Sequence, residues 1–174
     1  MHVCGYWCAK REEPRPPEAT LMSGRRYEAA IVALQKFRKV GDRTMEAWTQ
    51  HMLGGAYIRV RQLDAARPAL TDALRIFHGA SDAAGITLIL DDLSSLELAE
   101  GHNQRAARLW GAARSLAKTT GAGLASMVDE VVESDARPHV RKVLSPEDLT
   151  RLAAEGAAMT LDDLVAYALG PDAD

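Results

Sequence analysis

The sequence predicts an all-α protein in which helical hairpins stack into a repeat array. The apolar content is 47% and rests mainly on alanine and leucine, while aromatic residues make up 5%, a composition that favours helix. Apolar side chains recur at helical spacing within residues 64–78, and no segment alternates as a strand does. A similar pattern then returns along the chain, which is typical of repeat architectures.

Helices are predicted wherever this apolar spacing persists. The predicted ranges are 25–39, 43–61, 64–78, 82–100, 103–119, 123–136, 146–155 and 161–169. In the range 43–61 the buried stripe is expected to comprise Trp48, Met52, Leu53, Tyr57 and Val60.

Helix ends are marked by residues that suit them. Side chains able to cap a helix N-terminus stand at Asp42, Asp64, Ser81, Ser145 and Thr160. Glycines such as Gly79 are expected to end helices in the left-handed conformation. Pro68 lacks a backbone N–H, which argues for a later start of the helix drawn from residue 64.

Three regions follow from this reading. Residues 10–17 contain three prolines and five charged side chains, which oppose helix formation and burial, so residues 1–24 are predicted to be a flexible N-terminal segment. Residues 25–122 are expected to form the repeats. Residues 123–174 are expected to form capping helices that fold back over the end of the array, because each repeat hides only the face that its neighbour covers.

Internal similarity supports the array. Ala30, Ala66 and Ala106 close the opening turns of three predicted helices and lie 36 and 40 residues apart. Each alanine is followed four residues later by a large apolar residue, namely Leu34, Leu70 or Trp110. Trp110 is therefore expected to pack in the core.

The unit in residues 47–80 resembles the tetratricopeptide repeat, a helix–turn–helix of about 34 residues. The matching positions are Leu53, Gly54, Tyr57, Ala66, Leu70 and Ala73. A second copy, 87–119, has Ser94 and Glu97 at the positions of the glycine and the tyrosine, and a truncated first copy keeps only the helix 25–39. The resemblance implies a right-handed α-solenoid in which the first helix of each hairpin lines a concave groove.

A wider resemblance extends from residue 41 to residue 170. The runs GDRTMEAW, DDLSSLELAEGHNQRAARLWGAARSL and LSPEDLTRLAAEGAAMTLDDLVAYAL are similar to C-terminal repeat regions of actinobacterial signal-transduction ATPases of the LuxR and AfsR type. The resemblance implies a sensor of an inducer or a partner protein that regulates transcription or signalling. The sequence has no GxxxxGK[ST] phosphate loop and no recognisable DNA-binding helix-turn-helix, so ATP hydrolysis and DNA binding do not carry over.

Composition narrows the classes of partner. The net charge of −3 provides no broad basic field for nucleic acid or for an anionic membrane. No run of 18 apolar residues suggests a membrane span, and the start MHVCGYWCAK does not read as a secretory signal. A cytoplasmic location is therefore expected, with Cys4 and Cys8 reduced and with no cofactor. The expected partner is a protein or peptide, or a small-molecule effector.

The candidate site is the groove between the first helices of two hairpins. Its predicted contact residues are Trp48, His51, Gly55, Arg59, Asp91 and Ser95, with Ile58, Leu88 and Leu98 beside them. Such a mixed groove suits a peptide, a helix or an apolar small molecule. The first hypothesis is therefore a non-catalytic interaction or effector-sensing scaffold.

No catalytic or metal site is predicted. His2, Cys4 and Cys8 supply too few ligands for a structural zinc. The carboxylates Asp91, Asp92, Glu97 and Glu100 are interpreted as a solvated acidic stripe. The side chains of Asp91 and Asp92 are expected to diverge, because adjacent residues of a helix do not share a face.

Two alternatives stay open. A metal-dependent hydrolase would use Asp91, Asp92 and a histidine. A self-associating structural protein would form a homodimer through the apolar edge that the truncated first repeat, 25–39, leaves exposed.

Overall fold

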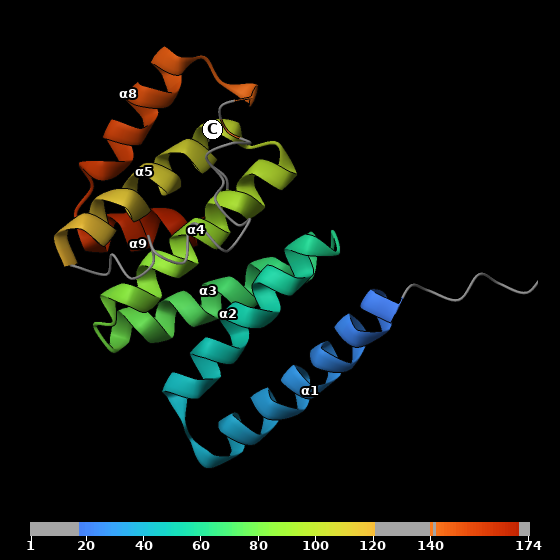
Figure 1. Cartoon of the computed structure of the whole chain (residues 1–174). Coiled ribbons are helices and arrows are strands. Elements are labelled where there is room, and N and C mark those ends of the chain that lie inside the picture. Colours follow the sequence, from blue (N-terminus) through green and yellow to red (C-terminus); the bar gives the residue numbers. More distant parts are fainter. Residues whose placement is uncertain (1–17, 121–139, 141, 171–174) are drawn as a thin grey trace, which may run out of the picture.

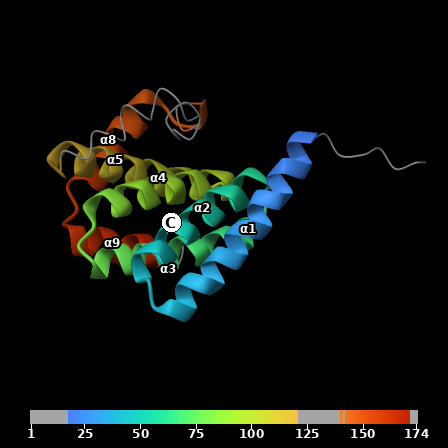
Figure 2. The same ribbon diagram turned by 60° about the horizontal axis from the view of Figure 1, so that its bottom comes forward.

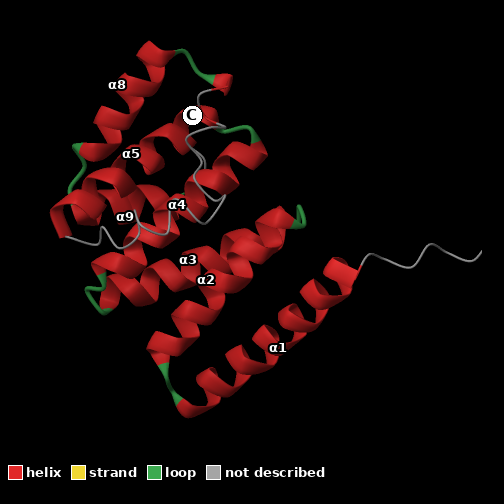
Figure 3. Ribbon diagram, in the orientation of Figure 1, coloured by secondary structure: helices red, strands yellow, loops and turns green. Residues whose placement is uncertain are grey.

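The computed structural model describes residues 18–120, 140 and 142–170, with side chains described from Tyr27 onward. The helices are α1 (Glu18–Val40), α2 (Arg43–Arg59), α3 (Leu63–Gly79), α4 (Ala83–Glu100), α5 (Asn103–Thr120), α8 (Pro146–Ala157) and α9 (Leu161–Leu169) (Figure 1). Short turns join consecutive helices from α1 to α5 and join α8 to α9, and no strand is present among the described residues (Figure 3). The all-α prediction is confirmed.

Most predicted helix boundaries lie within two residues of the helices α2–α5, α8 and α9. The exception is α1, which begins at Glu18, so residues 18–24 are helical rather than part of a flexible segment. Ala19, Leu21 and Met22 are strong helix formers, and the charge and proline of the preceding residues hid this start. The helix predicted over 123–136 lies outside the described residues.

Side-chain caps begin three helices as predicted. Asp42, Ser145 and Thr160 each accept a hydrogen bond from the backbone N–H three residues later, at 3.0, 3.1 and 3.2 Å. Pro146 and two acidic residues follow Ser145, which suits the positive end of the dipole of α8.

The predicted range of α3 lies within one residue of the helix at each end, but the residues predicted to cap it are wrong. Asp64 lies inside α3, whose cap Gln62 makes no side-chain hydrogen bond, and the helix starts at Leu63 even though Pro68 stands within it. The backbone position with φ of +55° that follows α3 belongs to Ser81, not to Gly79.

The N-cap of α4 is also one residue away from the prediction. It is Asp82 rather than Ser81, and Asp82 Oδ1 accepts a hydrogen bond at 2.9 Å from the backbone N–H three residues later. Ser81 therefore ends the preceding turn instead of capping the next helix.

From α1 to α5, helices that follow one another in the chain pack against each other, as Figures 1 and 2 show. α2 with α3 and α4 with α5 form two closely packed hairpins, α1 contacts α2, and α3 contacts α4. α2 also contacts α4, so the first helices of the two hairpins lie side by side. This arrangement places the candidate groove residues of α2 and α4 on neighbouring helices.

Small residues bring the helices of each hairpin close together. A Cβ placed on Gly54 of α2 would lie 2.6 Å from Cγ of Leu70 on α3, so only glycine fits without movement. In the second hairpin Ser94 takes this role, and its Oγ donates a hydrogen bond of 2.8 Å to the carbonyl oxygen of Ala106 on α5. The predicted need for small residues here is confirmed.

The helix α8 packs tightly along α5. A Cβ on Gly111 would lie 2.6 Å from the carbonyl carbon of Ala153, and one on Gly156 would lie 2.7 Å from that of Arg108. The backbones therefore touch at both glycines, and Gly156 lies inside the last turn of α8.

The last helix, α9, lies against α3 and α5 and joins the main apolar core. Its buried residues are Leu164, Val165 and Ala168. His78 Nε2 on α3 lies 3.0 Å from Asp162 Oδ1 at the start of α9. α9 therefore connects the two hairpins.

The main core draws its buried side chains from α2, α3, α4, α5 and α9, whereas the described side chains of α1, from Tyr27 onward, contribute none. α1 meets α2 through Tyr27, whose ring lies edge-on to that of Tyr57 with centroids 5.2 Å apart. Burial, together with the Tyr57 phenol, raises the pKa of Tyr27 to about 12.

None of the helices in the described residues combines the length and apolar character needed to cross a bilayer.

Candidate functional site

The first candidate site is the surface shared by α2 and α4, here called the α2–α4 face. It comprises Trp48, His51, Met52, Gly55 and Arg59 on α2 and Asp91, Asp92 and Ser95 on α4. On α2 these residues recur at helical spacing, so they line one side of the helix.

His51 and Asp92 link the two hairpins across this face. His51 Nε2 lies 3.0 Å from Asp92 Oδ2, and the exposed fractions of the two side chains are 21% and 17%. The pair is held in place by two packed helices and remains accessible from solvent. Asp92 was predicted to belong to the acidic stripe or, in the hydrolase alternative, to act with an unspecified histidine, and its pairing with His51 was not predicted.

Because Gly55 has no side chain, the backbone of α2 is uncovered beside the His51–Asp92 pair. A Cβ at Gly55 would lie 3.5 Å from Arg59 Nη1 and 3.7 Å from Asp92 Oδ2. A cation and an anion therefore flank the glycine, and Arg59 is exposed near the C-terminal end of α2. The structure thus gathers His51, Gly55 and Arg59 around Asp92.

Trp48 packs inward instead of standing free. Its ring lies 5.3 Å from that of Phe77 and 5.9 Å from that of His51, both edge-on. The accessible apolar side chain of the face is Met52, which is 65% exposed although it was predicted to be buried. Val60, also predicted to be buried, is exposed as well, because it lies past the end of α2.

Asp91 contacts α5, the second helix of its own hairpin. Arg114 Nη2 on α5 lies 2.8 Å from Asp91 Oδ2, whereas Asp92 contacts α2, so the predicted divergence of the two aspartates is confirmed. Ser95 Oγ donates a hydrogen bond of 3.1 Å to the carbonyl oxygen of Asp91 within α4. Asp91 therefore belongs to the α4–α5 contact at the edge of the face.

Glu97 contradicts the expected solvated acidic stripe, because it is 0% exposed. Its Oε1 accepts hydrogen bonds from Arg67 and Arg105, both at 2.9 Å, and its Oε2 lies 2.9 Å from His102 Nδ1. Arg67 also pairs with Glu100. We call these five residues the Glu97 network. A carboxylate can be buried here because two guanidinium groups neutralise it.

Arg105 extends the network to the end of the last helix. It is 1% exposed, and its Nη2 donates to the carbonyl oxygens of Tyr167, Ala168 and Gly170 at 2.6, 3.3 and 3.1 Å. Its guanidinium carbon also lies 4.5 Å from the centre of the Tyr167 ring. A cation at a helix C-terminus is favourable because unpaired carbonyls and the dipole are negative there.

Burial alone would raise the pKa of Glu97. Hydrogen bonds from Arg67, His102 and Arg105 outweigh burial and hold the pKa of this carboxyl below its usual value. Burial likewise opposes the charge of Arg67, yet Glu97 and Glu100 raise the pKa of that guanidinium above its usual value. Glu97 and Arg67 are therefore both charged at neutral pH.

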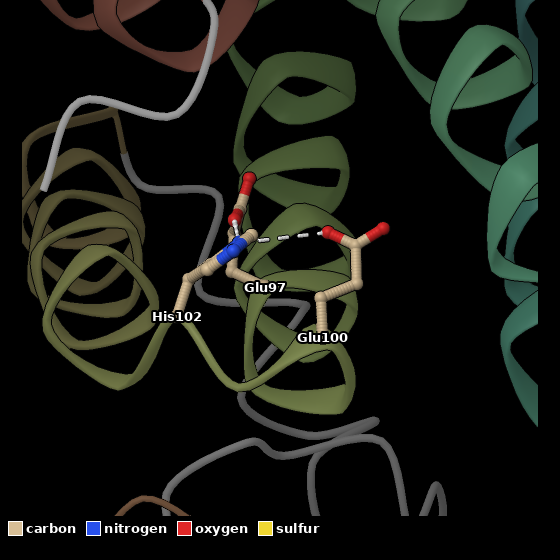
Figure 4. A group of neighbouring side chains, drawn as sticks. All are labelled: Glu97, Glu100 and His102. Atoms are coloured by element: carbon tan, nitrogen blue, oxygen red, sulfur yellow. Dashed lines mark hydrogen bonds and ion pairs between the residues drawn. The ribbon is translucent and has the colours of Figure 1, made fainter.

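Figure 4 shows Glu97, Glu100 and His102 close together at the turn between α4 and α5. One ligand atom from each lies within 4.8 Å of the others, which satisfies the spacing of a metal site. However, both oxygens of Glu97 already accept hydrogen bonds, and a divalent ion would face the charges of Arg67 and Arg105. The geometry suits arginine, and we assign no metal to it.

The remaining sequence candidates divide into two groups. His2, Cys4 and Cys8 lie outside the described residues. Trp110 is partly buried and packs against a second apolar cluster, whose buried residues include Ala106, Leu149 and Leu152, which supports its expected packing role.

Comparisons with known protein families, with curated proteins and with solved structures found no match to this chain. The geometry of the described residues therefore carries the functional argument.

Proposed function

We propose that this chain is a non-catalytic binding scaffold of the tetratricopeptide type, whose α2–α4 face recognises a protein or peptide segment. The observation that carries the proposal is the His51–Asp92 pair, held between two packed helices and flanked by exposed Met52 and Arg59. Rigid helices fix these groups before a ligand arrives, which lowers the entropic cost of binding.

The dimensions of the face suit a short extended segment. From Trp48 to Arg59 the line of side chains along α2 spans roughly 16 Å, given the rise of an α-helix. An extended peptide covers that length with about five residues. The bound segment would place an apolar side chain on Met52, a cationic group near Asp92 and a carboxylate near Arg59.

The resemblance to repeat regions of signal-transduction ATPases favours a regulatory role. On this proposal the chain is a cytoplasmic module, or a part of a transcriptional or signalling regulator, and it acts by changing which partner is bound to it.

The hydrolase alternative required Asp91 and Asp92 to act at one centre. Their side chains instead contact different helices, α5 and α2, which weakens that alternative.

A displayed library of random peptides, selected against the full chain, tests the proposal. Met52→Glu should weaken the selected peptides at least tenfold, because it places a charge on the accessible apolar contact. Val143→Glu is the matched control, since Val143 is also exposed, at 51%, and is adjacent to α8 rather than to the α2–α4 face. Arg59→Glu should reverse the preference for an acidic group.

The helical circular dichroism signal should be unchanged in all three variants, because the altered side chains are exposed. Selected peptides that bind Met52→Glu and Arg59→Glu as tightly as the parent would reject the α2–α4 face as the binding site.

A further inference from the structure

Asp92 has one carboxylate oxygen that no described side chain engages. Its Oδ2 lies 3.0 Å from His51 Nε2, and no ion pair or hydrogen bond to Oδ1 is present among the described residues. Gly55 lies next to both oxygens, since a Cβ there would be 3.7 Å from Oδ2 and 3.9 Å from Oδ1. Because glycine has no side chain, a group of a ligand can reach the Asp92 carboxylate across the backbone of α2.

A carboxylate that is open on one side is complementary to a basic group. The lysine or arginine side chain of a bound segment fits this place, and its charge is attracted to Asp92. His51 already faces the same carboxylate from α2 and becomes a second cation when it takes up a proton. Two cations can therefore compete for one anion.

His51 is the side chain of the α2–α4 face whose charge can change near neutral pH. Arginine and aspartate side chains normally keep a single charge between about pH 5 and 8, whereas a histidine side chain gains or loses a proton within that range. The His51 side chain is 21% exposed, so protons reach it from solvent. Arg59, the cation beside Gly55, acts equally throughout this range and adds no pH dependence.

On the helices that pack against α2, the charged or titratable side chains that have a partner bind groups other than His51, Asp92 excepted. They are Tyr27 and Arg38 on α1, Arg67, Asp72, Arg75 and His78 on α3, and Asp91, Glu97 and Glu100 on α4. Other charged side chains of α1 and α3 are exposed, namely Glu28, Lys36, Lys39 and Asp64. Among the described residues, Asp92 is therefore the charged group paired with His51.

We propose that protons and a basic side chain of the bound segment compete for Asp92, so that acidification releases the segment from the α2–α4 face. With His51 neutral, the basic group of the ligand interacts with the carboxylate without repulsion. When His51 takes up a proton, it compensates the charge of Asp92 and repels the ligand. Release is thus coupled to proton uptake at the imidazole, and by reciprocity a bound basic group disfavours that uptake. This regulation rests on the proposed function, because it concerns the same face.

The probe is a fluorescent peptide from the displayed library, selected at pH 8, that contains one lysine or arginine and no histidine. Its affinity for the full chain is measured by anisotropy at pH 8 and at about pH 5.5, which span the range of histidine titration. The parent should bind the probe at least about fivefold more weakly at the lower pH. The same peptide with glutamine at its basic position should bind with nearly equal affinity at both pH values.

Two variants should remove most of this pH dependence. His51→Gln takes away the group that gains a proton, and Asp92→Asn takes away the charge for which the two cations compete. His78→Gln is the matched control, since His78 Nε2 also lies 3.0 Å from an aspartate oxygen, that of Asp162, but at the contact between α3 and α9. It should keep the ratio of the two affinities found for the parent.

Nuclear magnetic resonance of the parent provides a test that needs no variant. The imidazole signals of His51 are followed from pH 8 to about pH 5 with and without the peptide. The basic peptide should move the titration of His51 to lower pH, whereas the glutamine peptide should not. A purely structural role of His51 would not produce this difference.

The outcomes separate this proposal from the proposed function. Selected peptides without a basic residue, or a pH dependence that is equal in the parent and in His51→Gln, would overturn the competition at Asp92. If Met52→Glu still weakens those peptides, the α2–α4 face remains the binding site. Peptides that bind Met52→Glu and Arg59→Glu as tightly as the parent would reject the face itself, and the competition with it.

Discussion

The fully buried side chain of Leu70 on α3 fills the space where Gly54 on α2 lacks a side chain. A Cβ on Gly54 would lie 2.6 Å from Leu70 Cγ. Gly55, the next residue, has no neighbour closer than 3.5 Å to such a Cβ. Two adjacent glycines of one helix therefore differ in what they tolerate.

The variants Gly54→Ala and Gly55→Ala should change stability in opposite directions. Overpacking against Leu70 should cost about 1–3 kcal/mol, partly offset by the better helix propensity of alanine. Gly55→Ala should gain about 0.5–1 kcal/mol from propensity alone. Urea unfolding followed by circular dichroism measures both, and equal effects would contradict the packing of α2 on α3.

The serines Ser94 and Ser95 offer a second matched pair. Ser94→Ala removes the hydrogen bond to the carbonyl oxygen of Ala106 on α5 and should cost about 1 kcal/mol. Ser95→Ala removes a bond within its own helix, to Asp91, and should cost a few tenths of that. A cost for Ser95→Ala as large as for Ser94→Ala would argue against a special role for Ser94 in joining the hairpin.

The buried carboxylate of Glu97 should make the protein lose stability in acid. Its folded pKa lies below the unfolded value of about 4.3, so its contribution is complete above that pH and is lost as the pH falls through the folded pKa. Glu97→Gln should reduce stability near pH 7 by about 3–5 kcal/mol, because it leaves the buried Arg105 without a counter-charge and removes one of the two carboxylates that pair with Arg67.

The same variant should also flatten the dependence of stability on pH below about pH 4.3, where the parent is losing this contribution. Glu147→Gln alters an exposed carboxyl at the start of α8 and serves as the control. An acid-unfolding profile unchanged by Glu97→Gln would show that the network is not what makes the protein sensitive to acid.

A substitution at Gly156 tests the close backbone contact between α8 and α5. A Cβ there would meet the backbone of Arg108, which cannot move aside as a side chain can, so Gly156→Ala should displace α8 from α5. Gly79→Ala meets no atom within 4 Å and should be tolerated. Hydrogen exchange at α8 reports the result, and protection of α8 that persists in Gly156→Ala would contradict the close contact.

The sequence predicted the helices well because their apolar spacing and caps are local signals. The period of Leu70, Ala73 and Leu74 marks a buried stripe without reference to any other helix, and all three are fully buried. Met52 shows the limit. It fits the apolar stripe of α2, yet no neighbouring helix covers it, and coverage depends on how hairpins stack rather than on spacing.

The candidate site was predictable only in part for the same reason. His51 and Gly55 were placed on the correct helix face, but Asp92 was missed because its pairing with His51 depends on how α2 and α4 lie side by side. Glu97 was misread because its burial depends on arginines of two other helices, Arg67 on α3, 30 residues away, and Arg105 on α5. A carboxylate at a position that carries tyrosine in the preceding repeat was the one available signal of burial.

The contact of Arg105 with the end of α9 affects how the molecule unfolds. In a simple stack each unit is stabilised by its neighbours, so terminal units fray first and intermediates accumulate. Here the last helix bridges both hairpins and is bound at its end by a buried guanidinium. Loss of either hairpin therefore releases the C-terminal helix too, so the array is expected to melt in one cooperative transition rather than unit by unit.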